Sequence, residues 1–490
     1  MRVSKSYVAK LDFNGKLRSA TLSATILTLL GGVVIPTQAV QMYVDTQTQQ
    51  VFTAPGPNRV KLSEFEEVNE AAGKVPPEEL KAMETKLRQK KKREELKATE
   101  DLAASLAPKE NWSDRISLRG YTQFRYNQPI SGDRVNLASP GDKFISNDQS
   151  FGIRRARIIL SGDATDHLYV YSQLEANSGP DAGDSQGGKA QIRDFYSDIS
   201  FDDKKEYRVR AGISKVPYGF EMLQSSQNRL AMDRADAVNI AARDERDLGL
   251  IFYWAPAHIR DRFRDLVRSG LKGSGDYGVF GMGVYNGQGL NRAELNDNLH
   301  TIARLSYPFK FDSGQFFEAG ISALSGKFVP KASAITVASV SVTPKFDSKG
   351  VRDERVGLHA VLYPQPFGLQ GEWNWGHSPL LSDDRNAIKS TSLNGGYVQA
   401  MYRLTNAHGN WTPYIKWQRY DGSEKFSTNA PFSHLRETEA GIEWQPVPEV
   451  ELVVAYANMD RTNVGTFVSS LNGYRQVKAD MIRAQLQWNF

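Results

Sequence analysis

The chain has 490 residues and no cysteine, which excludes a disulfide scaffold and thiolate metal sites. Hydrophobic residues make up 40% of it and charged residues 24%, and beyond the N-terminal segment no apolar run has the length of a transmembrane helix. Most of the net charge of +5 comes from residues 1–39, and the remaining chain carries only +1, so overall basicity identifies no partner.

The first 39 residues have the pattern of a secretory signal. A basic start precedes the apolar stretch ATLSATILTLLGGVVIP, and the small residues Thr37 and Ala39 then occupy the two positions that signal peptidase reads. A buried helix is the alternative interpretation. We predict an exported protein whose signal peptide is cleaved after Ala39.

Residues 40–110 are predicted to form a periplasmic linker. Four prolines discourage regular structure over residues 40–77. Residues 78–107 are rich in Ala, Glu, Lys and Leu and contain neither Gly nor Pro, which predicts a helix. Three apolar residues begin a heptad pattern that soon lapses. The helix is therefore expected to be solvated, and a short coiled coil or a periplasmic tether is the alternative.

From Ile116 to the C-terminus the chain is a succession of segments in which polar and apolar residues alternate. Alternation with a period of two is typical of β-strands that have one apolar face. The predicted strands are 116–126, 151–162, 167–177, 191–201, 206–215, 247–256, 276–286, 300–309, 315–325, 353–364, 367–376, 395–405, 410–420, 434–446, 449–459 and 474–490. Sixteen is an even number, as a barrel with both chain ends on one side requires. The barrel domain is predicted to span residues 111–490.

The lengths of the connections favour an outer-membrane barrel. Short connections such as 163–166 and 202–205 alternate with long ones such as 127–150 and 216–246. Outer-membrane barrels have short periplasmic turns and long external loops, whereas a sandwich or a propeller has no reason to sort its loops in this way. The exception is 257–275, whose basic amphipathic pattern predicts a helix at the membrane surface or at the periplasmic rim, or else an ordinary insertion.

The faces of the strands indicate the same architecture. Leu248, Leu250 and Phe252 share one face of the sixth strand, and the last strand alternates in the same way up to Trp488 and Phe490. A terminal aromatic residue on such a strand resembles the sorting signal of outer-membrane barrels, so these last two residues are predicted to act as the assembly signal. We predict an all-β fold: a 16-stranded antiparallel transmembrane β-barrel in the bacterial outer membrane, preceded by a short N-terminal helical segment.

A barrel of sixteen strands leaves a water-filled lumen, and the residues opposite the apolar faces are expected to line it. Because Ile158 and Leu160 face lipid, Arg157 must face inward. The inward-facing arginines are Arg119, Arg125, Arg155, Arg157, Arg208 and Arg210. Guanidinium groups in a pore select for anions.

The alternative is a charge-balanced lumen, in which these arginines pair with inward-facing carboxylates. The candidate partners are Glu175, Asp194, Asp198, Glu437, Glu439 and Glu443. Arg154 has the parity of the lipid-facing residues, which predicts that it lies at the external rim or on a β-bulge.

Three stretches resemble the phosphate-selective porins O and P. They are RRARIILSGD (154–163), DFYSD (194–198) and GISKVPYGFEMLQSSQNRLAMDR (212–234). The third carries a G-x-x-K-x-P-x-G-x-E-x-L-x-S pattern at Gly212, Lys215, Pro217, Gly219, Glu221, Leu223 and Ser225. The resemblance implies a sixteen-stranded homotrimer with a basic anion path. It also implies that Arg155 and Arg157 lie near a constriction, and that Lys215 and Arg234 lie at the bounds of the third loop.

The third loop, 216–246, is implied by the same resemblance to fold into the lumen and narrow it. The loop mixes charges of both signs, which suits a constriction held to the wall by salt bridges. The residues predicted to form the constriction are Glu221, Arg229, Asp233 and Arg234. The alternative is an external loop that packs over a neighbouring subunit.

No pattern typical of catalysis accompanies the barrel. The seven histidines lack the spacing of metal ligands, and neither a nucleophile elbow nor a phosphate loop is present, so no metal and no cofactor are predicted. We predict a passive outer-membrane diffusion channel for phosphate or other small anions. The alternatives are a non-selective general porin, an outer-membrane enzyme and a structural tether. The predicted partners are outer-membrane lipid, small anions such as phosphate, further copies of the chain and the barrel-assembly machinery, and nucleic acid is not among them.

Overall fold

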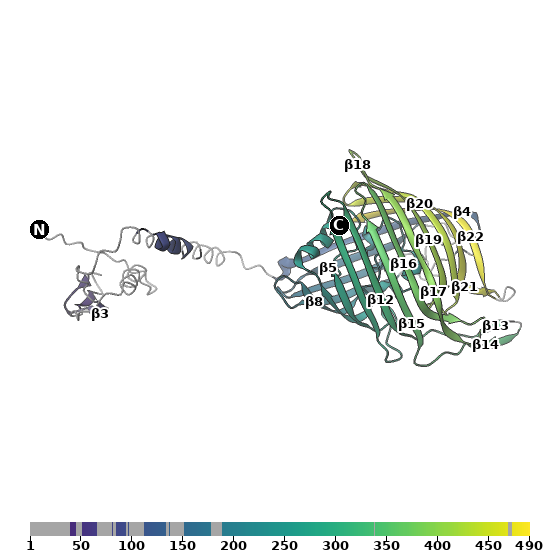
Figure 1. The fold of residues 1–490 in the computed structure, drawn as a ribbon, viewed down its shortest axis with the longest axis horizontal. Helices are drawn as coiled ribbons and strands as arrows, with labels where there is room; N and C mark the ends of the chain where they lie inside the picture. Colours follow the sequence, from purple (N-terminus) through teal and green to yellow (C-terminus); the bar gives the residue numbers. More distant parts are fainter. Residues whose placement is uncertain are drawn as a thin grey trace. The chain divides into compact units, whose positions relative to one another are not determined.

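The computed structural model describes residues 40–45, 51–65, 81, 85–94, 97, 112–133, 137, 151–177, 189–337, 339–468 and 473–490 (Figure 1). The chain divides into two compact units, Met1–Lys109 and Glu110–Phe490. The predicted signal peptide, residues 1–39, lies outside the described residues, and so does much of the predicted helix 78–107.

The N-terminal unit contains a small antiparallel sheet in the strand order β2-β1-β3. The strands are β1 (Val40–Asp45), β2 (Val51–Phe52) and β3 (Arg59–Phe65). The prediction of irregular structure over residues 40–77 is therefore wrong for the first part of that range. Its prolines do not prevent the sheet, because Pro55 and Pro57 lie in the connection between β2 and β3, where no ladder N–H is needed.

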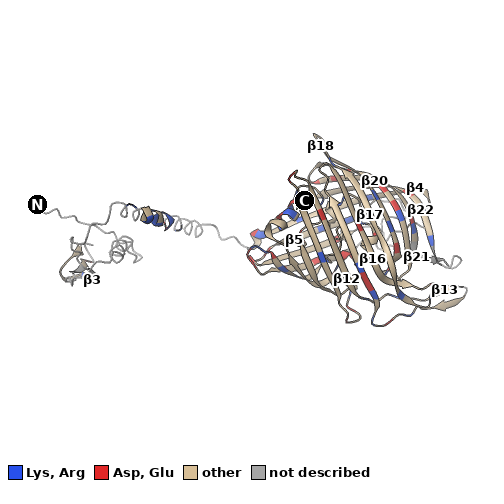
Figure 2. Cartoon of the chain, in the orientation of Figure 1, with Lys and Arg blue, Asp and Glu red and all other residues tan. Residues whose placement is uncertain are grey.

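Residues 85–94 are helical, within the predicted helix, and all ten side chains are exposed. Six of the ten are Lys or Arg, which colours this helix mostly blue in Figure 2. No helix in the described part of the chain is both long enough and apolar enough to cross a membrane.

The second unit is a closed antiparallel barrel. Its strands are β4 (Ile116–Gly132), β5 (Phe151–Asp163), β6 (Leu168–Asn177), β7 (Lys189–Ser200), β8 (Tyr207–Lys215), β9 (Arg246–Trp254), β10 (Phe280–Tyr285), β11 (His300–Lys310), β12 (Phe316–Phe328), β15 (Val351–Leu362), β16 (Phe367–Leu381), β17 (Ile388–Tyr402), β18 (Leu404–Asn406), β19 (Gly409–Ser423), β20 (Phe432–Val447), β21 (Val450–Val468) and β22 (Gly473–Asn489). The short β18 follows β17, and both pair with β19, so the two together count as one strand of the barrel. The described residues therefore form a barrel of sixteen strands. The predicted sixteen-stranded barrel is confirmed.

The barrel closes between its last and first strands. Backbone N–H groups of Gly120 and Phe490 each donate a hydrogen bond to the other residue's carbonyl oxygen, at 2.7 and 3.0 Å respectively. Because every strand has two neighbours, the sheet has no open edge that could pair with another chain.

Two ends of the barrel differ in their connections. The short-turn end carries turns such as 164–167 and 311–315, and the long-loop end carries connections such as 216–245 and 329–350. The long-loop ends of several hairpins are wrongly predicted as loops. Much of 460–473, for example, belongs to β21 and β22, because these strands continue to pair beyond the apolar stretch that identified them. The connection 329–350 carries its own hairpin, β13 (Ile335–Val337) and β14 (Val340–Val342).

The outward face of the barrel is apolar. Ile158, Leu160, Leu248 and Leu250 are each about half exposed (48–52%), as expected for side chains that face lipid instead of a protein core. Trp411 stacks on Trp444 near the short-turn end, with ring centroids 5.1 Å apart, in agreement with an interfacial aromatic girdle.

The one long connection at the short-turn end, 255–279, folds into the lumen. It contains α4 (Ala257–Arg268), whose Ile259, Phe263 and Leu266 are buried. Leu266 belongs to a buried cluster with Val361, an inward-facing residue of β15. The prediction of a surface helix is wrong, because these apolar residues pack against the inner wall instead of lipid.

Candidate functional site

The inward-facing wall of β4, β5 and β8 carries the predicted basic residues. Alternation along β8 buries Arg208 and Arg210 and turns Tyr207 toward lipid. The other predicted residues lie on the same inner surface, and all but the exposed Arg119 are at most 7% exposed: Arg119, Arg125, Arg155, Arg157 and Lys215. The structure therefore brings the predicted lumen residues onto one wall.

Two β-bulges add arginines to this wall. The register of β4 with β5 passes from Gln123–Arg155 to Phe124–Ile153, so that it skips Arg154, which lies on a bulge. The register of β6 with β7 skips Arg193 in the same way. Both arginines line one cavity inside the barrel, so the bulges turn inward two side chains that simple alternation assigns to lipid.

Most arginines of the wall are paired with carboxylates. Arg210 forms a bidentate pair with Asp198, at 2.7 and 2.9 Å. Arg157 donates a 2.6 Å hydrogen bond from Nε to Glu175. The two inward-facing carboxylates that were predicted as partners are therefore used as such, and much of the positive charge of this wall is balanced.

The same pairing extends around the barrel. The further pairs are Arg246 with Asp194, Arg461 with Glu437, Arg483 with Glu439, and Lys272 with Glu443. Figure 2 shows basic and acidic positions interleaved on the barrel strands. Burial of a charge is costly unless the charge is paired and hydrogen-bonded, which is the physical role of these contacts.

The long connection 216–245, here called loop 3, crosses the lumen and is anchored to β4 and β5. Ser226 of loop 3 receives a 2.7 Å hydrogen bond from Arg157, and its hydroxyl lies 2.6 Å from the hydroxyl of Tyr121. Its carbonyl oxygen accepts a 3.0 Å hydrogen bond from Gln123. These contacts place the start of loop 3 against the basic wall.

Other contacts anchor loop 3 to β4, β19 and β22. Lys416 of β19 donates a 2.6 Å hydrogen bond to Glu221, and Arg125 of β4 donates a 2.8 Å hydrogen bond to Asp233. Arg483 of β22 also pairs with Asp233. Loop 3 therefore spans the interior of the barrel, which is the course expected from the family resemblance and differs from that of an external loop.

Three basic residues on loop 3 or on the wall beside it have no carboxylate partner among the described residues. Arg229 of loop 3 is buried, and its Nε and Nη2 atoms have no hydrogen-bond partner. Burial, and then the neighbouring charge of Arg234, lowers the pKa of Arg229 to about 9. Lys215 donates only to the carbonyl oxygens of Leu223 and Gln224, at 2.8 and 3.0 Å. Arg119 is exposed and lies over the ring of Tyr171.

Loop 3 separates cavities on its two sides. The outer cavity, of about 310 Å³, contains Arg229 and is lined by six basic and five acidic described residues. The inner cavity, of about 400 Å³, contains Arg119 and Lys215 and is lined by eight basic and four acidic described residues. A third cavity of about 350 Å³, at the short-turn end, shares Arg119 and Asn228 with the inner cavity. Among these three cavities, the excess of basic over acidic described residues is therefore greatest in the inner cavity.

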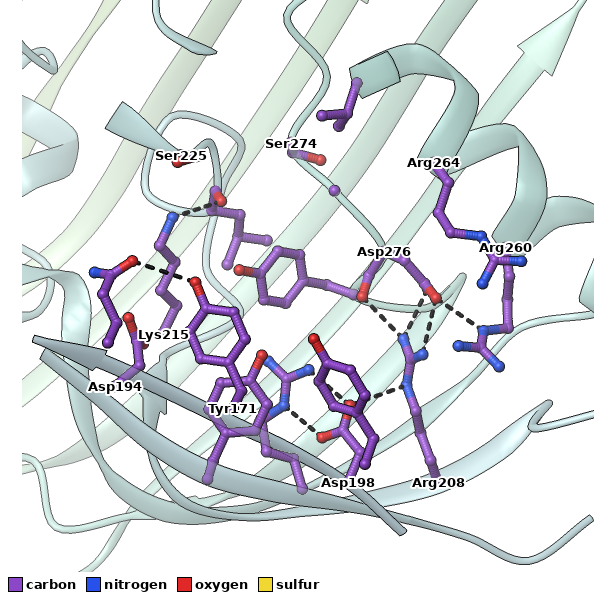
Figure 3. Close-up of a pocket in the computed structure, with 18 of the residues that line it drawn as sticks. Tyr171, Asp194, Asp198, Arg208, Lys215, Ser225, Arg260, Arg264, Ser274 and Asp276 are labelled. Atoms are coloured by element: carbon purple, nitrogen blue, oxygen red, sulfur yellow. Dashed lines mark hydrogen bonds and ion pairs between the residues drawn. The ribbon is translucent and has the colours of Figure 1, made fainter. Parts of the chain in front are cut away.

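The inner cavity, called the inner chamber below, is completed by the connection 255–279. Figure 3 shows Arg208 of the wall and Arg260 of α4 converging on Asp276. Although burial opposes it, these two guanidinium groups hold the pKa of Asp276 well below its usual range. The carboxylate thus stays charged and fixes the connection to the wall.

The described residues contain no cluster of three or more His, Asp or Glu side chains that could hold a metal ion. His359 lies 3.5 Å from Glu318 and His300 lies 3.5 Å from Asp353, and both pairs are buried in the wall. These histidines serve as partners of buried carboxylates.

Some residues of the site are missed by sequence reasoning. Arg193 is missed because a bulge shifts its parity, and no local pattern marks that bulge. Lys272 is missed because the connection 257–275 was expected outside the lumen, and Asp276 because it was predicted to begin the strand 276–286, whereas β10 begins only at Phe280. Arg246, which was placed in the loop, begins β9 and pairs with the wall residue Asp194. A glycine-rich return after an amphipathic helix at the short-turn end is the only signal that could have indicated an inward fold.

Comparison with known proteins supports the assignment. The family model described as phosphate-selective porin O and P matches residues 124–490. No curated protein sequence matches the chain. Among solved structures, the trimer form of OmpT from Vibrio cholerae is similar at 9% identity and a TM-score of 0.46, over 76% of this chain and 99% of that one. An anion-selective porin from Comamonas acidovorans is similar at 12% identity and a TM-score of 0.42, over 76% and 99%.

The match covers three quarters of the chain, a range that contains nearly the whole barrel and loop 3. The chain therefore belongs to the family of phosphate-selective porins O and P, and it is a channel of the bacterial outer membrane and not an enzyme.

Proposed function

We propose that the channel conducts small anions, phosphate among them, in preference to cations. The observation that carries this proposal is that basic residues without a described carboxylate partner line the cavities on both sides of loop 3. Arg229 lines the outer cavity, and Lys215 and Arg119 line the inner cavity. Such groups can exchange the hydration of a passing oxyanion for charge-assisted hydrogen bonds. The name of the family agrees with this preference.

The proposed path runs through the outer cavity, past residues 227–229 of loop 3, and into the inner chamber. Arg229 lines the outer cavity, and its neighbour Asn228 lines the inner chamber and the cavity at the short-turn end. We expect the narrowest point of this path near Arg155 and Arg157, where Ser226 of loop 3 accepts a hydrogen bond from Arg157. The preference is moderate, because most other arginines of the wall are neutralised by partners.

Further parts of the proposal concern assembly and export. We infer that residues 1–39 are removed after export, that residues 40–110 act as a periplasmic linker, that the barrel-assembly machinery reads Trp488 and Phe490, and that the channel is a homotrimer. The backbone of Phe490 completes the seam between β22 and β4, so a terminal signal there would be read where the barrel closes.

The reversal potential across a planar bilayer under a KCl gradient tests the proposal. We expect the sign of chloride preference, and we expect Arg119→Gln and Arg229→Gln each to reduce the permeability ratio of anions to cations. Arg436→Gln is the matched control, because Arg436 is exposed on the outward face of β20. A cation-preferring wild-type channel would contradict the proposal.

A non-selective general porin is the second candidate, and the pairing of the wall arginines favours it. The two candidates differ in the response of the chloride current to inorganic phosphate. An anion site inside the lumen predicts that phosphate reduces the chloride current in a saturable manner, and that Arg229→Gln weakens this block. A current that phosphate leaves unchanged would identify a general porin.

A further inference from the structure

The inner chamber has features that passage of a simple oxyanion does not require. Seven of its 25 described lining residues come from the connection 255–279, which has no counterpart among the short turns at the same end of the barrel. That connection contributes Arg260, Val267, Ser274, Asp276 and Tyr277 to the lining. The chamber is therefore a construction of two parts, the basic barrel wall and an inserted segment.

Tyrosines are concentrated in the chamber. Tyr169, Tyr171 and Tyr196 project from the wall strands β6 and β7, and Tyr277 projects from the inserted segment. The rings of Tyr171 and Tyr196 stack at 5.0 Å, and both side chains are only half-buried. Arg119 lies over the ring of Tyr171 and Arg210 over the ring of Tyr196, and the Tyr171 hydroxyl donates a 3.2 Å hydrogen bond to Gln173. Both tyrosines still line the cavity, where ring edges offer apolar contact for C–H bonds and phenol oxygens can accept hydrogen bonds.

Polar groups in the chamber remain available to a solute. The hydroxyl of Ser274 is buried and has no hydrogen-bond partner among the described residues. Lys215 and Arg119 form no ion pair with a carboxylate among the described residues, and Lys215 lies beside Ser225 of loop 3 in Figure 3. A buried donor without a partner is costly, so its retention points to a partner that enters from outside the chain.

We propose that the inner chamber is a binding site for a small organic anion that carries a hydroxylated ring, for which a hexose phosphate is the model. The anionic group would be held by Lys215 and Arg119. The ring would lie against Tyr171 and Tyr277 and exchange hydrogen bonds with Ser274. This inference deepens the proposed anion channel and rests on it, since the solute reaches the chamber by the same path.

The lining distinguishes this class from simpler solutes. A tetrahedral oxyanion such as inorganic phosphate gains nothing from tyrosine faces, because it has no apolar surface to place on them. A neutral sugar can accept hydrogen bonds from Lys215 and Arg119 but has no anionic group to place against them. The chamber volume of about 400 Å³ lies in the range of ligand sites, which is larger than inorganic phosphate needs. Only a solute with both a ring and a charge uses the whole lining.

Isothermal titration calorimetry on the folded, detergent-solubilised full chain tests the proposal. The probes are glucose 6-phosphate, inorganic phosphate, glucose and benzoate. We expect glucose 6-phosphate to bind at least about tenfold more tightly than each of the others, which is the effect of one additional well-made interaction. Equal binding of glucose 6-phosphate and inorganic phosphate would overturn the proposal. Tighter binding of benzoate would overturn the hydroxylated ring in favour of an aromatic one.

Three variants locate the site. Tyr171→Ala and Ser274→Ala should weaken binding of glucose 6-phosphate and leave binding of inorganic phosphate unchanged, whereas Arg119→Gln should weaken both. Tyr171→Phe keeps the ring, so it serves if the alanine variant fails to fold, and it should weaken binding less. Arg436→Gln is the control. Binding that none of the three variants weakens would place the site elsewhere and overturn the proposal.

The reversal potential of the same variants separates this inference from the proposed function. Anion preference without tighter binding of glucose 6-phosphate would refute the proposed binding site in the inner chamber and leave the proposal of an anion channel intact. Tight binding of glucose 6-phosphate in a channel without anion preference would refute the proposed function and leave the chamber as a site.

Discussion

Lys272 donates a 2.7 Å hydrogen bond to Glu443, and this contact joins the inserted segment 255–279 to the opposite wall of the barrel. A second carboxylate, Glu451, accepts from the same ammonium group at 2.9 Å. Although burial opposes it, the two carboxylates raise the pKa of Lys272 above its usual value, so the strut stays charged at physiological pH. Gln224 of loop 3 also donates to the carbonyl oxygen of Lys272, at 2.6 Å. The lumen is therefore crossed by two segments that touch each other.

The first prediction concerns the ion pairs of Lys272 with Glu443 and Glu451. Lys272→Met should destabilise the docked position of the inserted segment by about 3–5 kcal/mol, because it leaves two buried carboxylates without a cation. We expect a larger single-channel conductance, more frequent switching between conductance levels, and a weaker preference for anions. Single-channel recording in planar bilayers provides the measurement. Lys389→Met, at an exposed position of β17, is the control, and an unchanged conductance in Lys272→Met would show that the segment is held by its apolar contacts alone.

The second prediction concerns the anchor of loop 3 at Asp233. Asp233→Asn removes the carboxylate shared by Arg125 and Arg483, at a cost of about 3–5 kcal/mol for breaking a buried ion pair. We expect a higher permeability ratio of anions to cations and a lower thermal stability. Reversal potentials and the temperature at which the folded band disappears in gels report the two effects.

The control for this prediction is Asp383→Asn, in the exposed connection between β16 and β17. An Asp233→Asn channel with the wild-type permeability ratio would show that Asp233 lies off the conducting path.

The third prediction concerns pH. Burial, and then the nearby Asp236, raises the pKa of Glu424 to about 7, and Glu424 lines the outer cavity. Its neutral form predominates below that pKa, and a negative charge appears above it. Anion preference should therefore fall as the pH rises from 6 to 8. The contribution of the neutral Glu424 carboxyl to stability is fully present below the ordinary pKa of 4.5 and should be lost as the pH rises from there to about 7.

Glu424→Gln should remove most of this pH dependence. Lys425, whose pKa burial lowers to about 8, adds a change of the same sign at higher pH, so the residual effect in Glu424→Gln should be confined to the alkaline side. Reversal potentials at pH 6, 7 and 8 supply the data, and an unaltered profile in the variant would assign the titration to another group.

The fourth prediction concerns the C-terminus. Deletion of Phe490 removes two backbone hydrogen bonds at the seam with Gly120, each worth about 1 kcal/mol, and also the terminal aromatic side chain. We expect a smaller fraction of folded barrel in the outer membrane and an unchanged permeability ratio in the barrels that do form. Phe367→Ala is the control, because Phe367 also faces outward but lies in a strand away from the C-terminus. Normal assembly after the deletion would show that Phe490 is not the assembly signal.

The sequence predicts the barrel well because each of its strands is specified locally. Ile158 and Leu160 face lipid and Arg157 faces the lumen because side chains alternate along a strand, and this alternation can be read from adjacent residues. Strand number and the sorting of loop lengths follow from the same pattern. The predicted lumen arginines are correct in direction for that reason.

The partners of those arginines are decided by the tertiary structure. Arg208 pairs with Asp276, 68 positions away, and Arg125 pairs with Asp233, 108 positions away. No local pattern encodes such pairs, because they exist only once loop 3 and the inserted segment have entered the barrel. The charge of the path therefore depends on contacts that the sequence does not display.

The class of fold, the orientation of each strand face and the family can be read from the sequence, because they depend on periodicity and on motifs that are local in the chain. Which arginines are neutralised becomes visible only in the folded barrel. The same is true of the position of the connection 255–279 inside the lumen, and of the lack of a carboxylate partner among the described residues for Arg119, Lys215 and Arg229. The physical reason is that burial of a charge is paid for by whichever partner the closed barrel brings within reach, and closure joins segments from opposite ends of the chain.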